Sequence, residues 1–457
     1  MTSRLSRRDL LKRTAALSLL GSAGSFAADV AAMSTVAAQL DEYRALVCLF
    51  LLGGNDHTNL LVPTDTETYA EYAAARPSIA LQRDTLAATD LGPTASQGGR
   101  SFALHPSLAG IRQLYLDADA AIVANVGPLI VPTTVSQYLA GSVALPPKLR
   151  SHNDQQSAWQ ARQASGEGAH LGWGGSLADR LMNTNSSNVF TAVSTSGRPL
   201  FLSGSSIAPF QMSTSGGLNL KPAGASLYGS ARGSVVYQQM LTAGRAHLFE
   251  DEISAVTRRS LDANARLRTS LPPAGSLSPA LPANNLLAAQ LHVVARTIAA
   301  QTGLGTNRQV FFVGLGGFDT HDQLVPQQNA LLRQVDTAVT AFWSWLGQLG
   351  RRSQVVLFTA SDFGRALASN GDGSDHGWGA HHLVIGGDVN GGTIYGDVPP
   401  AAFGSSVDVG NGVFVPTISV DQYAARLGRW FGVSAADLDL VLPNLQAFDP
   451  DALISLF

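Results

Sequence analysis

Five short apolar runs, each ended by glycine or polar residues, constrain the fold of this 457-residue chain most strongly. They read YRALVCLFLLGG, AAIVANVG, QVFFVGLGG, QVVLFTASD and HHLVIGGD. Such runs are typical of parallel strands buried on both faces of a sheet. Helical patterns lie between them in LAGIRQLYLDA, NLLAAQLHVVARTIAAQ and NALLRQVDTAVTAFWSWLGQL. The alternation predicts an α/β fold whose mainly parallel central sheet is sandwiched by helices.

The N-terminal residues have the pattern of a targeting segment. A basic head with Arg7 and Arg8 in SRRDLLK precedes a mildly apolar run and then small residues. This order resembles a twin-arginine export signal. We expect residues 1–38 to be a signal peptide, with its cleavage site left open, and residues 39–457 to be an exported, periplasmic domain.

Several partners and covalent features are not expected. Gly21, Gly24 and Asp29 interrupt an apolar run already shorter than the ~20 residues that a membrane helix needs, so we expect no stable membrane span. The net charge is -3 and no long run of Lys or Arg is present, which argues against a nucleic-acid partner. Cys48 is the single cysteine and excludes an intrachain disulfide.

Residues 183–286 differ in composition from the rest of the chain. They are rich in Ser, Gly, Ala and Pro and contain one long helical pattern from about Gly233 to Thr269. Apolar residues such as Phe201 and Phe210 are interspersed with them. We therefore expect an insertion or cap that forms a packed surface lobe.

Potential ligands follow three of the predicted strands. Asp56 follows the first run, Asp319 and His321 follow QVFFVGLGG, and Asp362 and Arg365 follow QVVLFTASD. Ligands bind beyond the carboxyl ends of the strands in an open parallel sheet, so these side chains are candidates for one site. Each Asp also has an ordinary alternative as a turn residue or a helix cap.

A glycine-rich stretch, GDGSDHGWGAHHLVIGGD, adds Asp375 and three histidines. Its glycines allow the backbone near His376 to approach a ligand closely. His381 and His382 are adjacent in a predicted strand, so their side chains should point to opposite faces and at most one should reach the site. His382 is our candidate.

The stretch KLRSHNDQQSAWQ places Ser151 at a predicted helix start. A hydroxyl there is well placed for nucleophilic attack, because the helix N-terminus stabilises negative charge. The alternative is that Ser151 is only a helix cap and His152 only a surface residue.

Five ordered motifs resemble a known family. FLLGGND, RSHNDQ, GLGGFDTHDQ, TASDFGR and DHGWGAHHLVIGGDVNGGTIYG, after a twin-arginine leader, are similar to the exported bacterial proteins grouped as domain of unknown function 1501. The resemblance covers roughly Arg44 to Pro400. That family looks like a branch of the alkaline phosphatase and sulfatase superfamily. It implies an alkaline phosphatase-like fold and cleavage of phosphate or sulfate esters with divalent metals.

The resemblance also implies site residues. Asp56 matches the metal-binding Asp after the first strand, and Asp319 with His321 matches the second Asp/His motif. Asp362 and His376 match later metal ligands, whereas Ser151 is a weaker match to the nucleophile at a helix start.

The sequence departs from the superfamily in several places. Phe363 stands where phosphatases often have a histidine ligand, and Asp319 and His321 are closer together than in the phosphatase pattern. No Cys-x-Pro-x-Arg is present, which excludes a sulfatase that uses formylglycine. His57 stands where relatives tend to have glycine, and is either an extra ligand or tolerated.

Two hypotheses follow. In the first, the protein is a metal-dependent hydrolase of a small-molecule or polymer-linked phosphate or sulfate ester, in which either the Ser151 hydroxyl or a water molecule attacks. Zn²⁺ or Mn²⁺ suits mixed carboxylate and imidazole ligands, and Mg²⁺ or Ca²⁺ suits an all-oxygen set. Arg365 either binds a non-bridging ester oxygen or forms a structural ion pair.

In the second hypothesis, the protein is a non-catalytic exported binding or assembly protein. The resemblance adds a co-encoded exported protein as a possible partner.

Overall fold

The computed structural model of this chain describes residues 42–164, 168–217 and 226–457. The predicted signal peptide over residues 1–38 lies outside the described residues. Residues 44–457 form one unit. Within the described ranges, no helix combines the length and the hydropathy needed to cross a membrane.

The centre of the fold is a mainly parallel sheet built around the first apolar run. β1 (Arg44–Leu52) pairs in parallel with β9 (Arg308–Gly316) on one side and with β10 (Val355–Ser361) on the other. Its residues from Ala45 to Phe50 have no solvent exposure, as a strand covered on both faces requires. The sheet runs in the order β14 (Ile394–Tyr395), β5 (Ala120–Gly127), β13 (Ala380–Gly386), β10, β1, β9, β6 (Ala192–Ser194), β7 (Phe210–Ser213) and β8 (Gly216–Gly217), with β15 (Ile418–Ser419) beside β5.

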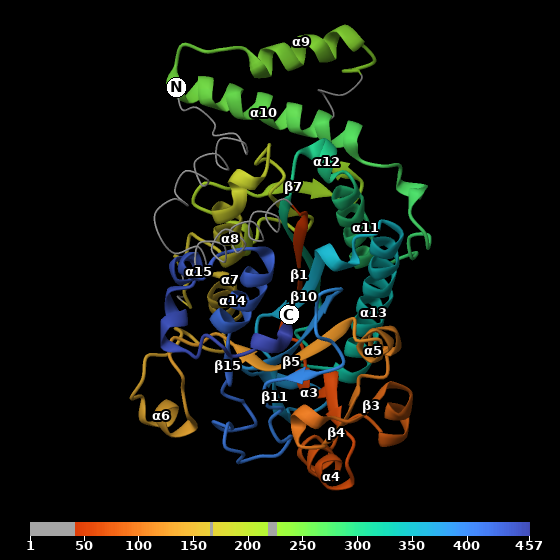
Figure 1. Cartoon of the computed structure of the whole chain (residues 1–457), viewed down its shortest axis with the longest axis vertical. Helices are drawn as coiled ribbons and strands as arrows, with labels where there is room; N and C mark the ends of the chain where they lie inside the picture. The colour runs from red at the N-terminus through yellow and green to blue at the C-terminus, as the bar shows by residue number, and fades with distance from the viewer. Residues whose placement is uncertain (1–41, 165–167, 218–225) are drawn as a thin grey trace, which may run out of the picture. The chain divides into compact units, whose positions relative to one another are not determined.

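Helices cover both faces of this sheet, as the sequence predicts (Figure 1). The three predicted helices pack together on one face, and a second group packs against β1, β5, β9 and β10 from the other. The first group is α5 (Ala109–Leu116), α11 (Leu286–Ala299) and α13 (Leu324–Gln348); the second is α7 (His152–Gln160), α8 (Trp173–Leu181), α14 (Val420–Phe431) and α15 (Ala435–Val441). The mainly parallel α/β class is thereby confirmed.

The last predicted strand does not run parallel to its neighbours. β13 is antiparallel to both β10 and β5. Between β10 and β13 the chain forms a hairpin of β11 (Arg365–Ser369) and β12 (Ser374–His376) and no helix. A parallel return requires a crossover, usually through a helix, so the chain comes back antiparallel. The start of β13 consequently lies beside the carboxyl end of β10.

The range 183–286 contains more than a surface lobe. β6 pairs in parallel with β9, so this part of the range extends the central sheet. The predicted long helix is two helices, α9 (Ala231–Thr242) and α10 (Leu248–Ser270). The turn between them includes Gly244 and is fixed by Asp251, whose carboxylate accepts a hydrogen bond from the backbone N–H of Arg245 at 2.9 Å.

Smaller elements lie near the carboxyl end of β1. A three-stranded antiparallel sheet consists of β2 (Leu61–Pro63), β4 (Ser101–Leu104) and β3 (Asp90–Pro93). It packs with α4 (Thr66–Ala75) beyond the short helix α3 (His57–Leu60) that follows β1. The carboxyl ends of β1, β9 and β10 and the β11–β12 hairpin meet at this edge, where the sequence places its candidate ligands.

Asp421, in the first turn of α14, makes the fold sensitive to pH. Burial raises the pKa of its carboxyl from 3.8 to about 7, and its Oδ1 has no hydrogen-bond partner. A native pKa above the unfolded one stabilises the fold at low pH, and this stabilisation is lost as the pH rises from about 4 to about 7, by at most about 1.4 kcal/mol per pH unit. Asp421→Asn should remove this loss.

The measurement is the melting temperature between pH 4 and pH 8 of the wild type, Asp421→Asn and the control Asp439→Asn, which changes an exposed carboxyl on α15. Asp421→Asn should be more stable than the wild type at pH 8 and lose that advantage at pH 4. Parallel curves for all three proteins would contradict this account.

Candidate metal centre

Four segments meet at the carboxyl edge of the sheet and each carries a polar side chain. Asp319 lies in the loop after β9, Asp362 directly follows β10, and His376 ends β12. His152 is the first residue of α7, which packs against β10. The parallel strands bring the two aspartates to one edge, and the hairpin and the helix bring the two histidines over it.

Glycines make this close approach possible. Gly53 follows β1 with φ +115°, and a Cβ added there would lie 2.4 Å from the backbone nitrogen of Asp319. A Cβ at Gly377, next to His376, would lie 2.3 Å from the carbonyl oxygen of Gly364. Any side chain at either position would therefore push apart two of the segments that carry the site.

His152 is held by a buried carboxylate. Its Nδ1 donates to Asp362 Oδ2 at 2.7 Å. Asp362 has no solvent exposure and also accepts hydrogen bonds from the Gly53 backbone N–H at 3.1 Å and from Gln156 at 2.8 Å. The hydrogen bond with Asp362 is the main cause that raises the pKa of His152. The other nitrogen, Nε2, is buried without a hydrogen-bond partner and lies 3.3 Å from Asp319 Oδ2.

His376 has the same arrangement with a different acceptor. Its Nδ1 lies 2.8 Å from the carbonyl oxygen of Arg150 and must donate, because a carbonyl only accepts. In the neutral ring, Nε2 then carries the lone pair, and it lies 3.2 Å from Asp319 Oδ1. Burial lowers the pKa of His376 and so favours this neutral form.

His321 completes the group from the loop after β9. Its Nδ1 lies 3.4 Å from Asp375 Oδ1, whereas its Nε2 lies 3.1 Å from Asp319 Oδ1 and 2.9 Å from His376 Nε2. The imidazole is about two-fifths exposed, so it stands at the solvent side of the group.

Arg365 positions the central carboxylate. Its Nη1 donates to Asp319 Oδ1 at 3.0 Å and to the Gly53 carbonyl, and its Nε and Nη2 donate to Ser374. Burial would raise the pKa of Asp319, but the hydrogen bond from Arg365 and the nearby positive charges lower it. Every nitrogen of this fully buried guanidinium is occupied by the protein. The geometry therefore supports the structural ion pair and not direct contact of Arg365 with an ester.

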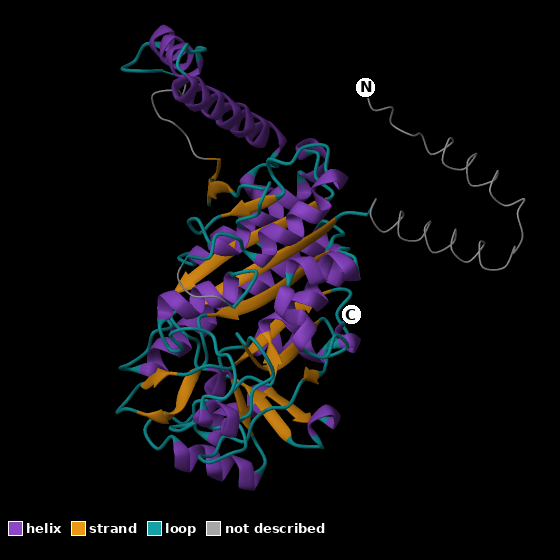
Figure 2. Cartoon of the chain, turned by 90° about the vertical axis from the view of Figure 1, so that its left-hand side faces the viewer, coloured by secondary structure: helices purple, strands orange, loops and turns teal. Residues whose placement is uncertain are grey.

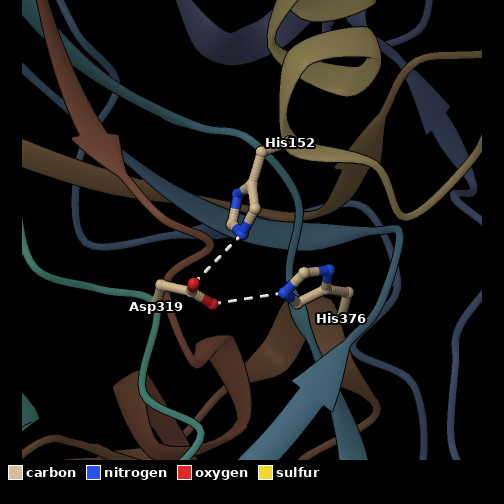
Figure 3. Close-up of side chains that lie close together, drawn as sticks. All are labelled: His152, Asp319 and His376. Carbon is tan, nitrogen blue, oxygen red and sulfur yellow. Dashed lines mark hydrogen bonds and ion pairs between the residues drawn. The ribbon is translucent and has the colours of Figure 1, made fainter.

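Three imidazole Nε2 atoms thus face one carboxylate (Figure 3 shows two of them). Ligand atoms of His152, Asp319 and His376 all lie within 4.8 Å of one another. Phe363 stands where the superfamily resemblance would place a histidine ligand. Its ring packs against the rings of His152 and His376, with 4.9 and 4.6 Å between centroids.

Asp56 is not part of this group. Its two carboxylate oxygens are bound by Arg76, at 2.9 Å from Nη1 and 2.5 Å from Nη2, and both side chains are fully buried. Arg76 thus compensates the buried charge of Asp56 and turns both carboxylate oxygens toward itself, away from the histidine cluster. His57 beside it is also buried, and burial lowers its pKa to about 3.

His382 also lies elsewhere. It stacks on Tyr423 and contacts Trp159 inside the fold, and burial lowers its pKa to about 3. His381 faces the other side of the strand, where its Nδ1 accepts the backbone N–H of Asn125 at 3.0 Å. The expected opposite orientation of the two rings is found, but neither ring contacts the group around Asp319.

Ser151 precedes α7 without capping it through its side chain. Its hydroxyl donates to Asp154 Oδ2 at 2.7 Å. Its neighbour His152, expected from the sequence only as a surface residue, points into the group. The only signal for it is the polar run SHNDQQ, in which three side chains, His152, Asp154 and Gln156, make partly buried contacts.

A cavity of about 410 Å³ opens beside the group. His321 and His376 form one wall of it, and Arg150 and Asp375 contribute charged side chains. The remaining lining is Ala366, Ala368, Ser369, Asn411 and Val413. The cavity gives a small polar molecule access to the two imidazoles that line it, those of His321 and His376.

The buried Asp56–Arg76 pair predicts separate effects on folding and metal binding. Arg76→Met would leave the Asp56 charge buried without a partner and should lower the free energy of unfolding by about 3–5 kcal/mol. Urea denaturation measures this loss, and titration with Zn²⁺ should find unchanged affinity per folded molecule. Loss of Zn²⁺ affinity in Asp56→Asn, beyond any change in the folded fraction, would show instead that Asp56 is a ligand.

Comparison with solved structures finds similar chains of low sequence identity. Ps i-CgsB, solved with k-i-k-neocarrahexaose, is 10% identical with a TM-score of 0.36, and the match covers 90% of this chain and 77% of the other. The PsFucS1 sulfatase from Pseudoalteromonas sp. is 13% identical with a TM-score of 0.38, covering 94% and 75%. The lipoteichoic acid synthase LtaP from Listeria monocytogenes is 7% identical with a TM-score of 0.35, covering 87% and 74%. Similarities this low assign no activity to this chain.

Among curated proteins, none matches this sequence. The family model described as "Protein of unknown function (DUF1501)" matches residues 43–419, which is most of the chain and agrees with the resemblance drawn from the five motifs. The chain therefore belongs to the DUF1501 family.

Proposed function

We propose that His152, His321, His376 and Asp319 bind a divalent metal ion, and that the protein is an exported metal-dependent hydrolase of a phosphate or sulfate ester. One observation carries the proposal. Each imidazole has its Nδ1 beside an acceptor, and its Nε2 directed toward the same carboxylate.

The spacing of these atoms fits a common ion. Atoms bound to one zinc ion at about 2.0–2.1 Å are about 3.3 Å apart at tetrahedral angles and about 2.9 Å apart at right angles. Four contacts in the group are 2.9–3.3 Å: Asp319 Oδ1 to the Nε2 atoms of His321 and His376, these two Nε2 atoms to each other, and Asp319 Oδ2 to Nε2 of His152. The Nε2 atom of His152 is buried and has no hydrogen-bond partner. A metal ion bound at this nitrogen would satisfy it.

The donor set favours Zn²⁺, or another transition metal such as Mn²⁺, over Mg²⁺ and Ca²⁺. Zinc binds imidazole nitrogen and carboxylate oxygen, whereas Mg²⁺ and Ca²⁺ take oxygen ligands almost alone. Histidines that bind metals commonly donate their other N–H to a carboxylate or a backbone carbonyl, which fixes the ring and its tautomer. Asp362 and the Arg150 carbonyl have this role here.

The residues around the proposed metal ion would have different roles in hydrolysis. A bound divalent ion supplies Lewis acidity, which neutralises ester oxygens and makes a water molecule easier to ionise. Arg365 fixes Asp319, and Asp362 fixes His152. Arg150, on the wall of the cavity, provides a cation for the ester group, while its carbonyl holds His376. Phe363 shields the two imidazoles against which it packs.

Ser151 is the less favoured nucleophile in this arrangement. Its hydroxyl is engaged with Asp154, and α7 presents His152 to the centre. A water molecule therefore fits the role better than the Ser151 hydroxyl.

Metal binding is tested by titrating the metal-free protein with Zn²⁺. The wild type should bind Zn²⁺, and Asp319→Asn and His376→Ala should lose most of the affinity. Asp362→Asn should weaken it by about 10–100-fold, because the ring of His152 loses its charged acceptor. Zn²⁺ at a hundredfold excess over its Kd should stabilise the wild type by about 2.7 kcal/mol.

His170→Ala, which changes an exposed histidine, is the control and should bind Zn²⁺ like the wild type. Equal Zn²⁺ affinity in the wild type and in Asp319→Asn would refute the site. A wild type indifferent to Zn²⁺, Mn²⁺, Mg²⁺ and Ca²⁺ would leave the non-catalytic binding or assembly protein as the remaining hypothesis.

Hydrolysis is tested with p-nitrophenyl phosphate and p-nitrophenyl sulfate on the zinc-loaded protein. Asp319→Asn should lower kcat/KM by at least about a hundredfold, since the metal's contribution is several kcal/mol. Ser151→Ala should retain activity within a few fold. Loss of activity in Ser151→Ala with metal still bound would instead make Ser151 the nucleophile. If neither ester is cleaved by protein that binds Zn²⁺, the hydrolase proposal fails while the metal site stands.

A further inference from the structure

The helices α9 and α10 form a hairpin beyond one end of the central sheet (Figures 1 and 2). The two helices contact each other, and Arg258 of α10 donates a hydrogen bond to the carbonyl of Thr242 at the end of α9. The second half of α10 packs against β8 and against α12 (Gln301–Leu304). The first half of α10 extends past these elements.

One face of α10 is apolar along most of its length. Phe249, Ile253 and Val256 follow the i, i+4, i+7 spacing of a single helix face and are 73%, 67% and 46% exposed. The same face continues into Ala263 and Leu267, which are buried. Folding therefore covers the second half of the face and leaves the first half, which we call the α10 stripe (Phe249, Ile253 and Val256), in contact with solvent.

The first half of α10 carries a group of acidic residues followed by a pair of basic residues. Glu250, Asp251 and Glu252 lie in its first turns and Arg258 and Arg259 lie two turns later. Arg259 Nη2 lies 2.7 Å from Glu252 Oε1, so these two side chains stand on the same side of the helix. Both are mostly exposed, which leaves them free to exchange partners with a neighbouring helix.

These features complement a second copy of the same helix running in the opposite direction. A two-fold axis near residues 255 and 256 would place Glu252 of each copy opposite Arg259 of the other. The two α10 stripes would then meet around Ile253 and Val256, close to the axis. A parallel arrangement would instead place Glu252 opposite Glu252. Self-complementary pairing about a two-fold axis is the commonest form of protein oligomer, and opposite charges beside an apolar seam select the orientation of the helices.

We propose that this protein is a homodimer whose interface is formed by the α10 stripes packed antiparallel. The same axis places Phe249 of the second copy at the level of Asp262 along the helix, on the stripe side. There it lies beside a groove of about 420 Å³ between α10 and β7. The apolar part of its lining is Pro209, Phe210, Leu261 and Val256 of the stripe itself, and the polar part is Arg198, Gln211, Thr257, Ser260 and Asn264. An aromatic side chain and the apolar side of a mixed groove are thus brought together twice by symmetry.

The test is sedimentation of the purified full chain over a range of concentrations. The wild type should dimerise. Glu252→Arg and Arg259→Glu should each raise the dissociation constant at least about tenfold, because like charges then meet at both ends of the interface. The double variant Glu252→Arg with Arg259→Glu should restore dimerisation. Ile253→Asp should give a monomer, and Leu440→Asp, at a similarly exposed apolar residue on α15, should leave the dimer intact.

A wild type that stays monomeric at about 100 µM would overturn the proposal, as would a dimer that Ile253→Asp does not weaken. Failure of the double variant to recover what each single variant loses would exclude the antiparallel arrangement. Binding of a monomeric wild type to anionic lipid vesicles, lost in Ile253→Asp, would assign the stripe to a membrane surface instead. All of these results are independent of metal binding and hydrolysis.

Discussion

The buried carboxylate of Asp362 is the contact on which the geometry of the site depends. Asp362 directly follows β10, and its carboxylate accepts the backbone N–H of Gly53, which directly follows β1. It also accepts hydrogen bonds from His152 and Gln156 on α7. One side chain thus connects two central strands to the helix that carries a candidate ligand. A charged group without solvent exposure must be compensated, and these three donors are what the fold supplies.

His152 links the charge of Asp362 to the charge of Asp319 at the centre of the candidate site. Protonated His152 would neutralise Asp362 and face Asp319, and the raised pKa of His152 reflects its hydrogen bond with Asp362. A divalent ion at Nε2 would place positive charge beside the same two carboxylates and also satisfy His321 and His376. Proton and metal therefore compete for one position, and metal binding should strengthen as the pH rises above the pKa values of the imidazoles.

The central sheet and the placement of Asp319 and Asp362 at its carboxyl edge could be predicted from the sequence, because both depend on local patterns. Apolar runs mark β1, β9 and β10, and ligand positions beyond their carboxyl ends identified Asp319 and Asp362. Other features depend on contacts without a local pattern. Arg76 lies 20 residues beyond Asp56 and binds its carboxylate, and the hairpin after β10 reverses β13 and keeps His382 inside the fold. His152 comes from a helix and not from a strand end, so the rule that found the aspartates passes over it.

The most direct test of the metal centre is anomalous diffraction at the zinc absorption edge from crystals of the protein grown with Zn²⁺. Our account predicts an anomalous peak about 2.0–2.2 Å from the Nε2 atoms of His152 and His376 and from an oxygen of Asp319, with His321 on the side facing the cavity. Zinc-containing crystals with no peak at this position, or with the peak beside Asp56 or His382, would contradict it.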